Sequence, residues 1–215
     1  ALLLSQPMQM VYAEEENNPE ATQEAADVNP EAKTEEQIAA EEAAKKQASY
    51  DTPADTNGLE NWPTGPNVYA ASAIVMDIDS GAVLYGKQID EKRYPASITK
   101  LLTVLVALEN ANLTDKITFT DECLNFLEWD DANIGMRAGE EITLEEALYG
   151  VLLASANEVS YAVAKNVGEN LGIGYDGFIE LMNERAQELG CKNSHWVNAN
   201  GLHDENHYTT AYDMA

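Results

Sequence analysis

Apolar residues occur on nearly every side of the helix predicted for Ile98 to Ala111. The positions that surround its axis are Leu101, Leu102, Leu105, Val106 and Leu108. A helix that is apolar all round needs other elements around it, because its surface cannot face water on any side. We therefore expect an internal helix, with Ser97 at its N-terminal end.

The elements predicted around this helix indicate an α+β fold. Apolar runs at 71–77 and 83–85, separated by Asp79-Ser80-Gly81, are typical of a β-hairpin. The other predicted elements are a strand at 117–120, a helix at 143–154 that begins with a capping box of Thr143 and Glu146, and helices at 157–170 and 175–189. A turn is predicted at 198–202, and a last helix opens at Ala211. In this order a helical cluster follows the opening strands.

Residues 14–61 have a different composition from the rest of the chain. They are rich in Glu, Ala, Gln, Asn, Thr and Pro, and no apolar periodicity marks a face that could be buried. Such a segment cannot offset the entropy of folding, so we predict an acidic disordered tether. Good helix formers between Thr34 and Ala48 leave open a part-time helix or a segment that binds a partner.

The first thirteen residues resemble the end of a secretory signal peptide. They open with Ala1-Leu2-Leu3-Leu4 and close with Val11-Tyr12-Ala13, which has small residues at the two positions that a signal peptidase requires. We expect a partial signal peptide at 1–13 and an exported protein at the cell envelope. The alternative is an apolar terminus without a targeting role.

The charge of the chain argues against nucleic acid as a partner. Residues 14–60 hold 14 acidic and 3 basic side chains, and residues 61–215 hold 24 and 9. Both parts therefore repel phosphate backbones and anionic membrane surfaces. We expect no nucleic-acid partner.

Ser97 and Lys100 stand three residues apart at the start of the predicted internal helix. Side chains at this spacing share one face, with Cβ atoms about 5–6 Å apart, so a hydroxyl and an amine come within reach of each other. A serine hydroxyl needs a base to take its proton, and lysine can serve when burial keeps its amine neutral. A capping serine beside a lysine that extends to solvent is the structural alternative.

The run from Tyr94 to Thr103, Tyr-Pro-Ala-Ser-Ile-Thr-Lys-Leu-Leu-Thr, resembles the active-site serine segment of penicillin-binding proteins. The likeness is to their low-molecular-mass D-alanyl-D-alanine carboxypeptidases in particular. A second element, Ser155-Ala156-Asn157, resembles the family's Ser-x-Asn motif, although alone it would fit a turn between helices. The resemblance covers about residues 68–215.

This resemblance implies a β-lactamase/transpeptidase-like fold of the α+β or α/β class, with an antiparallel sheet packed with a helical cluster. It also implies a set of roles. Ser97 would attack the carbonyl between the two terminal D-alanines of a peptidoglycan stem peptide, and Lys100 would be its general base. Ser155 would relay a proton to the leaving amine, and Asn157 would bind the substrate amide and steady Lys100. β-Lactam antibiotics would acylate Ser97, and the chemistry needs no metal or organic cofactor.

The remaining histidines and cysteines receive no chemical role from the sequence. His195, His203 and His207 are expected at the surface or in turns. Cys123 and Cys191 make no metal site by their spacing, and the sequence leaves open whether they are bridged or free.

One family element is missing from the 215 residues. No Lys-Thr-Gly occurs, and the nearest run, Lys33-Thr34-Glu35, lies in the predicted tether. In the family that motif lies on a strand beside the cleft, where it supplies an oxyanion donor and a cation for the substrate carboxylate. We therefore expect 62–215 to be an incomplete catalytic domain, truncated before its sheet is complete and poorly active alone. Any membrane anchoring would come from a C-terminal segment outside this chain.

Two other functions fit part of the pattern. A serine β-lactamase shares the fold and Ser-x-x-Lys, but a class A enzyme would show a Glu-x-x-Leu-Asn loop, and the corresponding region, 188–193, does not fit. A non-catalytic wall-binding protein could keep the fold without its chemistry. The presence of Ser97, Lys100, Ser155 and Asn157 argues against it.

Overall fold

The computed structural model describes residues 33–215, which divide between a unit that ends at Glu42 and a unit that starts at Ala43. The predicted signal peptide and the first part of the predicted tether lie outside the described residues. The elements are α1 (Glu35–Asp51), β1 (Ala73–Met76), β2 (Val83–Lys87), α2 (Thr99–Asn110), β3 (Lys116–Thr118), β4 (Glu141–Thr143), α3 (Leu144–Leu153), α4 (Asn157–Asn170), α5 (Gly174–Glu188) and α6 (Ala211–Met214).

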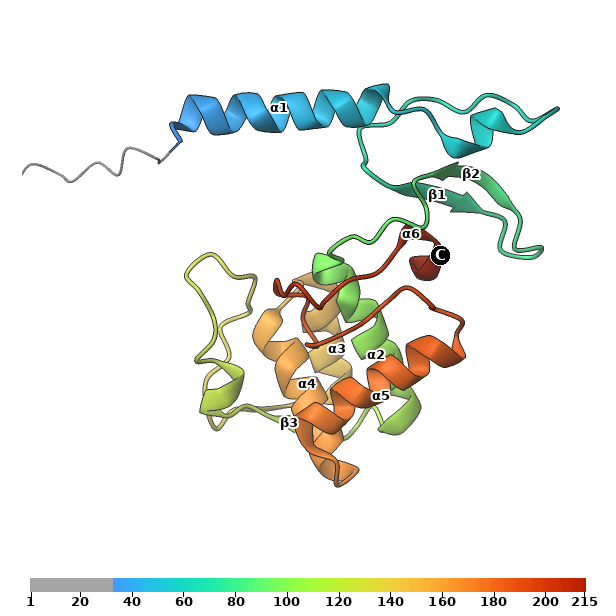
Figure 1. Ribbon diagram of the computed structural model, residues 1–215. Coiled ribbons are helices and arrows are strands. Elements are labelled where there is room, and N and C mark those ends of the chain that lie inside the picture. The colour runs from blue at the N-terminus through green and yellow to red at the C-terminus, as the bar shows by residue number, and fades with distance from the viewer. Residues whose placement is uncertain (1–32) are drawn as a thin grey trace, which may run out of the picture. The chain divides into compact units, whose positions relative to one another are not determined.

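The strands form two separate antiparallel pairs. β1 pairs with β2 from Ala73 opposite Lys87, and β3 pairs with β4 from Lys116 opposite Thr143. Figure 1 shows α2, α3, α4 and α5 gathered in one cluster, with the β1–β2 hairpin next to α6. The mixture of antiparallel strands and clustered helices is the one that the sequence predicts.

The core lies between these four helices. α4 contacts α2, α3 and α5, and the side chains buried there include Val106, Leu144, Val159, Phe178 and Met182. Burying an aliphatic or aromatic side chain of this size stabilises the fold by about 1.5–3 kcal/mol. Cys123 is a free thiol within this core, and Cys191 is also free. The helical cluster is therefore the stable part of the structure, and the geometry of a site built on these helices depends on it.

Helix α3 begins where the sequence predicts it. The Thr143 hydroxyl accepts a hydrogen bond from the backbone N–H of Glu146, and the Glu146 carboxylate accepts from the backbone N–H of Thr143 at 2.8 Å. This reciprocal pair satisfies two donors that a helix start would otherwise leave unpaired. The capping box is confirmed.

Helix α2 is buried on one side only, which corrects the prediction of an internal helix. Leu101 is 56% exposed and Leu108 is 48% exposed. The reason is that α3, α4 and α5 all contact the side of α2 that carries Val106 and Ala107. An apolar stripe lies away from that side, and we define it as Ile98, just before the helix, with Leu101, Leu105 and Leu108. Leu105 is half-buried at the edge of the core, and the other three are exposed.

Part of the segment predicted as a disordered tether has regular structure. α1 opens with reciprocal hydrogen bonds between Thr34 and Gln37, at 2.9 and 3.2 Å, and none of its residues is buried. Its Ala, Glu, Lys and Gln residues favour helix without an apolar face to pack. None of the helices in residues 33–215 has the length and apolar character that crossing a bilayer requires.

A buried lysine attaches the end of α1 to the hairpin. Lys87 in β2 is fully buried, and its Nζ donates to the carbonyl oxygens of Ser49 at 2.5 Å and Val68 at 2.8 Å. The sequence analysis placed the start of the folded domain at Trp62. The contact between Lys87 and Ser49 shows that ordered structure joined to the hairpin begins earlier in the chain. The partners are main-chain carbonyls, which leave no trace in a side-chain pattern.

The segment after α5 is fastened to α2 by a buried histidine. His207 is 2% exposed and so does not lie at the surface, but it does end a turn, because its backbone N–H donates to the Asp204 carbonyl at 3.0 Å. His195 and His203 are exposed. The Nδ1 atom of His207 accepts the backbone N–H of Val197 at 3.1 Å, and its Nε2 lies 2.7 Å from Thr99 Oγ1. Because Nδ1 accepts, Nε2 carries the proton of a neutral ring. Burial lowers the pKa of His207 to about 4.

Stability is expected to fall in acid because of this ring. Histidine in the unfolded chain has a pKa of about 6.5, whereas folded His207 has a pKa of about 4. Between these two pH values the unfolded chain binds a proton that the folded protein does not bind, and this favours unfolding. At about pH 5 this ring should cost the wild type about 2 kcal/mol of unfolding free energy relative to about pH 7. Urea unfolding of wild type and His207→Gln at both pH values measures it.

His203→Gln is the matched control, because His203 is exposed. That variant should lose as much stability in acid as the wild type, whereas His207→Gln should lose less. Equal acid sensitivity of all three proteins would contradict the assignment of the neutral, buried ring.

Candidate active site

Ser97 lies at the entrance to helix α2. It sits in a 3₁₀ helix, Ala96–Ile98, that runs directly into α2 after the buried Pro95. Proline suits such a start because its fixed φ matches a helix and no N–H is lost from a hydrogen bond. The Ser97 side chain is exposed, so its hydroxyl can meet a ligand from solvent.

Lys100 lies one turn further along and is almost entirely buried. Only 2% of it is exposed, and its Nζ lies 3.1 Å from Ser97 Oγ. The same nitrogen donates to Asn157 Oδ1 at 2.8 Å and to the carbonyl oxygen of Asn200 at 2.7 Å. Three oxygens from three segments of the chain therefore surround one amine.

The number of partners matters for the chemistry of Lys100. An ammonium has three N–H donors, and here each has an oxygen to bind. A neutral amine has two N–H donors and one lone pair. The two acceptors that cannot give up a proton, Asn157 Oδ1 and the Asn200 carbonyl, keep both donors, so the lone pair is left to face Ser97.

The environment also brings the neutral form of Lys100 within reach near physiological pH. Burial lowers the pKa of Lys100 to about 8, against the opposing effect of the Asp131 and Glu158 charges. Burial disfavours the ammonium because the low-dielectric interior solvates charge poorly. About a tenth of the protein therefore has a neutral Lys100 at about pH 7.

Ser155 lies in the turn between α3 and α4, and Asn157 lies just after that turn. Asn157 is the first residue of α4, and it is 6% exposed with its amide oxygen on Lys100. Ser155 is half-buried, and within the described residues its hydroxyl makes no hydrogen bond to Ser97 or Lys100. The structure thus joins Ser97, Lys100 and Asn157 by hydrogen bonds, and Ser155 lies two residues before Asn157 in the chain.

Two residues next to this group have strained backbone. Ala96 has φ of 48° and Ser155 has φ of 56°, in the left-handed region that costs residues with a Cβ on the order of 1–3 kcal/mol. One precedes the serine of the first motif, and the other is the serine of the second. Such strain persists only where the surrounding packing enforces it, and here it marks both motifs.

The segment 198–201 completes the surroundings of Lys100. Thr103, one turn beyond Lys100 on α2, donates to the Ala199 carbonyl at 2.7 Å, next to the Asn200 carbonyl that Lys100 binds. Gly201, with φ of 89°, lies against Ala96, and a Cβ on it would stand 1.9 Å from the Ala96 carbonyl oxygen. The sequence analysis assigned this segment to a turn, because a main-chain carbonyl acting on a lysine has no side-chain signature.

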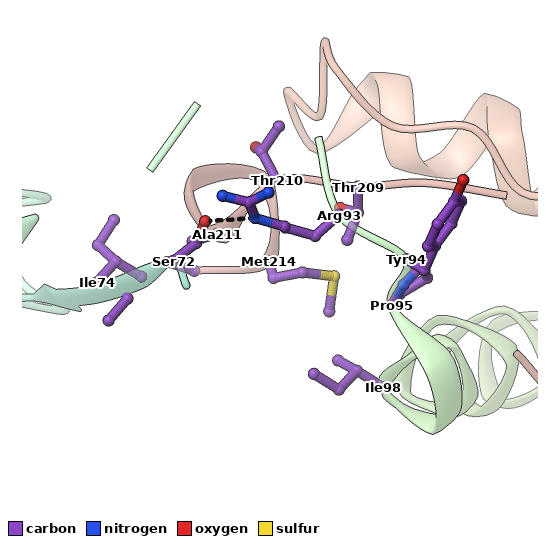
Figure 2. Close-up of a pocket in the computed structure, with 12 residues that line it drawn as sticks. Ser72, Ile74, Arg93, Tyr94, Pro95, Ile98, Thr209, Thr210, Ala211 and Met214 are labelled. Atoms are coloured by element: carbon purple, nitrogen blue, oxygen red, sulfur yellow. Dashed lines mark hydrogen bonds between the residues drawn. The ribbon is translucent and has the colours of Figure 1, made fainter. Parts of the chain in front are cut away.

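Pro95 and Ile98 also line an open, mostly apolar pocket of about 460 Å³. Figure 2 shows Ile98 and Met214 projecting toward it, and Arg93 donating through Nε to Ser72 Oγ, a bond of 3.0 Å. Ser97 and Lys100 do not line it. This pocket borders the apolar stripe of α2 and is separate from the chemistry at Ser97.

Within residues 33–215, no three His, Cys, Asp or Glu side chains gather in a way that could hold a metal ion. The polar groups around Ser97 are instead an amine, an amide and carbonyl oxygens. These groups are suited to moving a proton from a hydroxyl and to binding a peptide amide. The arrangement can therefore support acyl transfer to a serine.

A family profile described as D-alanyl-D-alanine carboxypeptidase matches residues 60–215. The chain belongs to this family. The D-alanyl-D-alanine carboxypeptidase DacF of Bacillus subtilis is 36% identical over 151 residues, which are 68% of this chain and 37% of the relative. The D-alanyl-D-alanine carboxypeptidase DacA of Haemophilus influenzae is 31% identical over 157 residues, 71% of this chain and 39% of the relative.

Solved structures have the same fold. Penicillin binding protein 5 from Haemophilus influenzae matches with a TM-score of 0.65 at 29% identity, over 71% of this chain and 45% of that protein. The carboxypeptidase DacD from Francisella tularensis matches with a TM-score of 0.65 at 28% identity, over 73% and 38%. The predicted family and fold are confirmed, and the chain spans about two fifths of the length of these curated relatives.

Gly201 offers a test of how tightly the segment 198–201 is held. Gly201→Ala should destabilise the protein by about 2–4 kcal/mol, since the new Cβ would collide with the Ala96 carbonyl in addition to the cost of a positive φ. Gly81→Ala is the control, because Gly81 has φ of 70° with no atom near its Cβ position. Thermal and urea unfolding compare the two, and equal losses would show that the contact with Ala96 yields easily.

Proposed function

We propose that this protein is a serine-type D-alanyl-D-alanine carboxypeptidase that cleaves peptidoglycan stem peptides through an acyl-enzyme on Ser97. The observation that carries the proposal is the placing of Lys100 Nζ, 3.1 Å from Ser97 Oγ and bound to two further oxygens that fix its direction. Family membership supports the substrate class, because the relatives carry this activity in their names.

In the first half of the reaction, Ser97 Oγ forms a bond to the carbonyl carbon of the penultimate D-alanine. Its proton passes to the neutral amine of Lys100, whose other two N–H groups stay on Asn157 and Asn200. The C–N bond to the last D-alanine then breaks, and a proton reaches the leaving nitrogen. Water hydrolyses the resulting ester on Ser97 and releases the shortened peptide.

Asn157 and Ser155 would assist at different stages. Asn157 Oδ1 holds Lys100 and one N–H of its Nδ2 is bound to Asp131, which leaves the second N–H to donate to the amide oxygen of the substrate. Ser155 is the proposed relay to the leaving amine, a role implied by the family motif. Its hydroxyl would join the hydrogen-bond chain once substrate is bound, since catalytic bonds often tighten only in the complex.

The surroundings proposed for this reaction are those of the cell envelope. The signal-peptide-like residues 1–13 support export, and the net charge of −26 argues against nucleic acid as a partner. β-Lactam antibiotics are the proposed covalent inhibitors, because Ser97 Oγ can attack the carbonyl of the strained β-lactam ring as it attacks the stem peptide. No metal or organic cofactor enters the proposed chemistry.

Labelling with a fluorescent penicillin tests the nucleophile. Wild-type protein should carry one stable label, and Ser97→Ala should carry none, because the ester oxygen is gone. Ser160→Ala is a control, since Ser160 is buried in α4 and donates to the Ala156 carbonyl. A label that persists on Ser97→Ala would overturn the assignment.

Two further measurements separate the carboxypeptidase from its closest competitor. The protein should release D-alanine from a peptide ending in D-Ala-D-Ala and should lose its penicillin label slowly. Rapid hydrolysis of penicillin without D-alanine release would indicate a β-lactamase. Since Lys-Thr-Gly is absent from the 215 residues, turnover by the chain alone should be low, and single-turnover labelling is the sharper readout.

The rate of labelling should follow the titration of Lys100. Because the neutral amine is the base, the second-order rate constant should rise about tenfold per pH unit below about pH 8 and level off above it. Lys100→Arg should lose at least about 10³-fold at every pH, because guanidinium stays charged. Stopped-flow labelling from about pH 6 to about pH 10 gives the profile, and a flat profile would contradict the proposed base.

Lys92→Arg is the matched control for that substitution. The Lys92 ammonium lies over the Tyr208 ring, 3.8 Å from its centroid, whereas the Ser97 hydroxyl is hydrogen-bonded to Lys100. Its labelling profile should match that of the wild type.

A further inference from the structure

The loop before β4 is fixed to the first residues of α4 by three hydrogen bonds. The backbone N–H of Asn157 donates to the Ala132 carbonyl at 2.8 Å, and its side-chain Nδ2 donates to Asp131 Oδ1 at 3.3 Å. The backbone N–H of Ile134 donates to the buried Glu158 carboxylate at 2.7 Å. Both of the residues that begin α4 thus have partners in residues 131–134.

The Asp131 carboxylate is held from its own loop as well. Its Oδ2 accepts the backbone N–H of Glu128 at 2.9 Å, while Oδ1 faces Asn157. With both oxygens bound, the side chain has one orientation. It is half-buried, whereas its neighbour Asp130 is exposed.

The oxygen and nitrogen of a side-chain amide can exchange places by a half-turn, and the hydrogen-bond partners decide which orientation is stable. If the Asn157 amide turned over, Nδ2 would point at Lys100 Nζ, a donor facing a donor, and the amide oxygen would point at the Asp131 carboxylate. In the observed orientation Oδ1 accepts from Lys100 at 2.8 Å and Nδ2 donates to Asp131. Nδ2 carries two hydrogens, so the bond to Asp131 leaves one to donate elsewhere.

We propose that Asp131 is a positioning residue for the acylation reaction, which it supports by fixing the Asn157 amide so that its oxygen holds Lys100 and its second N–H faces the substrate. This inference rests on the proposed function and adds a residue to it. Asp131 acts through Asn157 and does not itself touch the reacting atoms.

The charge of Asp131 gives the arrangement a second effect. The titratable groups facing Lys100 are Asp131 from the loop and Glu158 from α4, and the segment 198–201 contributes a carbonyl with no titratable side chain. Both carboxylates favour the ammonium and oppose the effect of burial on the pKa of Lys100. Asp131 therefore improves the geometry of the base while holding more of it in the charged form.

Two substitutions separate these effects. Asp131→Asn removes the charge and keeps a side-chain oxygen for Asn157, whereas Asp131→Ala removes both. In Asp131→Asn the midpoint of the labelling profile should move down by about 0.5–1 pH unit, with the high-pH plateau within about twofold of the wild type. In Asp131→Ala the midpoint should move similarly and the plateau should fall at least about tenfold.

Asp130→Asn is the control, because it removes the same charge from an exposed neighbour. Its midpoint should stay within about 0.2 pH unit of the wild type, since solvent screens that charge. Equal shifts in Asp130→Asn and Asp131→Asn, or an unchanged plateau in Asp131→Ala, would overturn the proposal.

A readout without catalysis keeps this test apart from that of the function. The Lys100 signal can be followed by NMR in lysine-labelled protein and assigned with Lys100→Arg. The same downward shift in Asp131→Asn, and none in Asp130→Asn, should appear even if no penicillin reacts. If the Lys100 pKa falls in Asp131→Asn but no penicillin reacts, only the proposed function is contradicted. If penicillin reacts but the Lys100 pKa does not change in Asp131→Asn, the role of Asp131 is contradicted.

Discussion

The site depends on the burial of one amine. Lys100 in α2 contacts the 3₁₀ helix before it, α4 and the segment 198–201, and its Nζ binds an oxygen of each. A charged lysine is costly to bury, and an unpartnered one more so, which makes all three contacts necessary to the fold around it. The same burial lowers the pKa of Lys100 to about 8, so the interaction that joins three segments also prepares the base.

This arrangement places strain at its edges. The chain bends sharply at Ala96 and at Ser155, and Gly201 approaches the Ala96 carbonyl more closely than any residue with a side chain could. The free energy gained by burying the side chains of the helical core offsets the free energy of this strain. A small stable body thus supports a site whose geometry no isolated segment would adopt.

Side-chain patterns in the sequence predicted the helical part of the fold and the side chains at the centre of the site. The positions of α4 and α5, the capping box at Thr143 and the two motifs follow from periodicity, hydrogen-bonding chemistry and family resemblance. The buried face of α2 did not follow, because Leu101 and Leu102 look alike in sequence and only the placing of the neighbouring helices distinguishes them.

The partners of the site were also hidden in the sequence. Asn200 acts through its carbonyl, which every residue has, and Lys87 binds carbonyls 19 and 38 residues away in the chain. His207 and Asp131 looked like ordinary polar residues in loops. Their roles arise from contacts between segments distant in sequence, which a single sequence does not encode locally.

The apolar stripe of α2 also affects how these molecules meet one another in solution. Near neutral pH the net charge of −26 keeps copies apart at long range, so exposed leucines seldom come into contact. As the carboxylates take up protons near about pH 4, that repulsion disappears while the stripe is unchanged. Mild acid therefore removes colloidal protection in the same range in which the His207 ring gains a proton, and self-association and loosening of the fold should reinforce each other there.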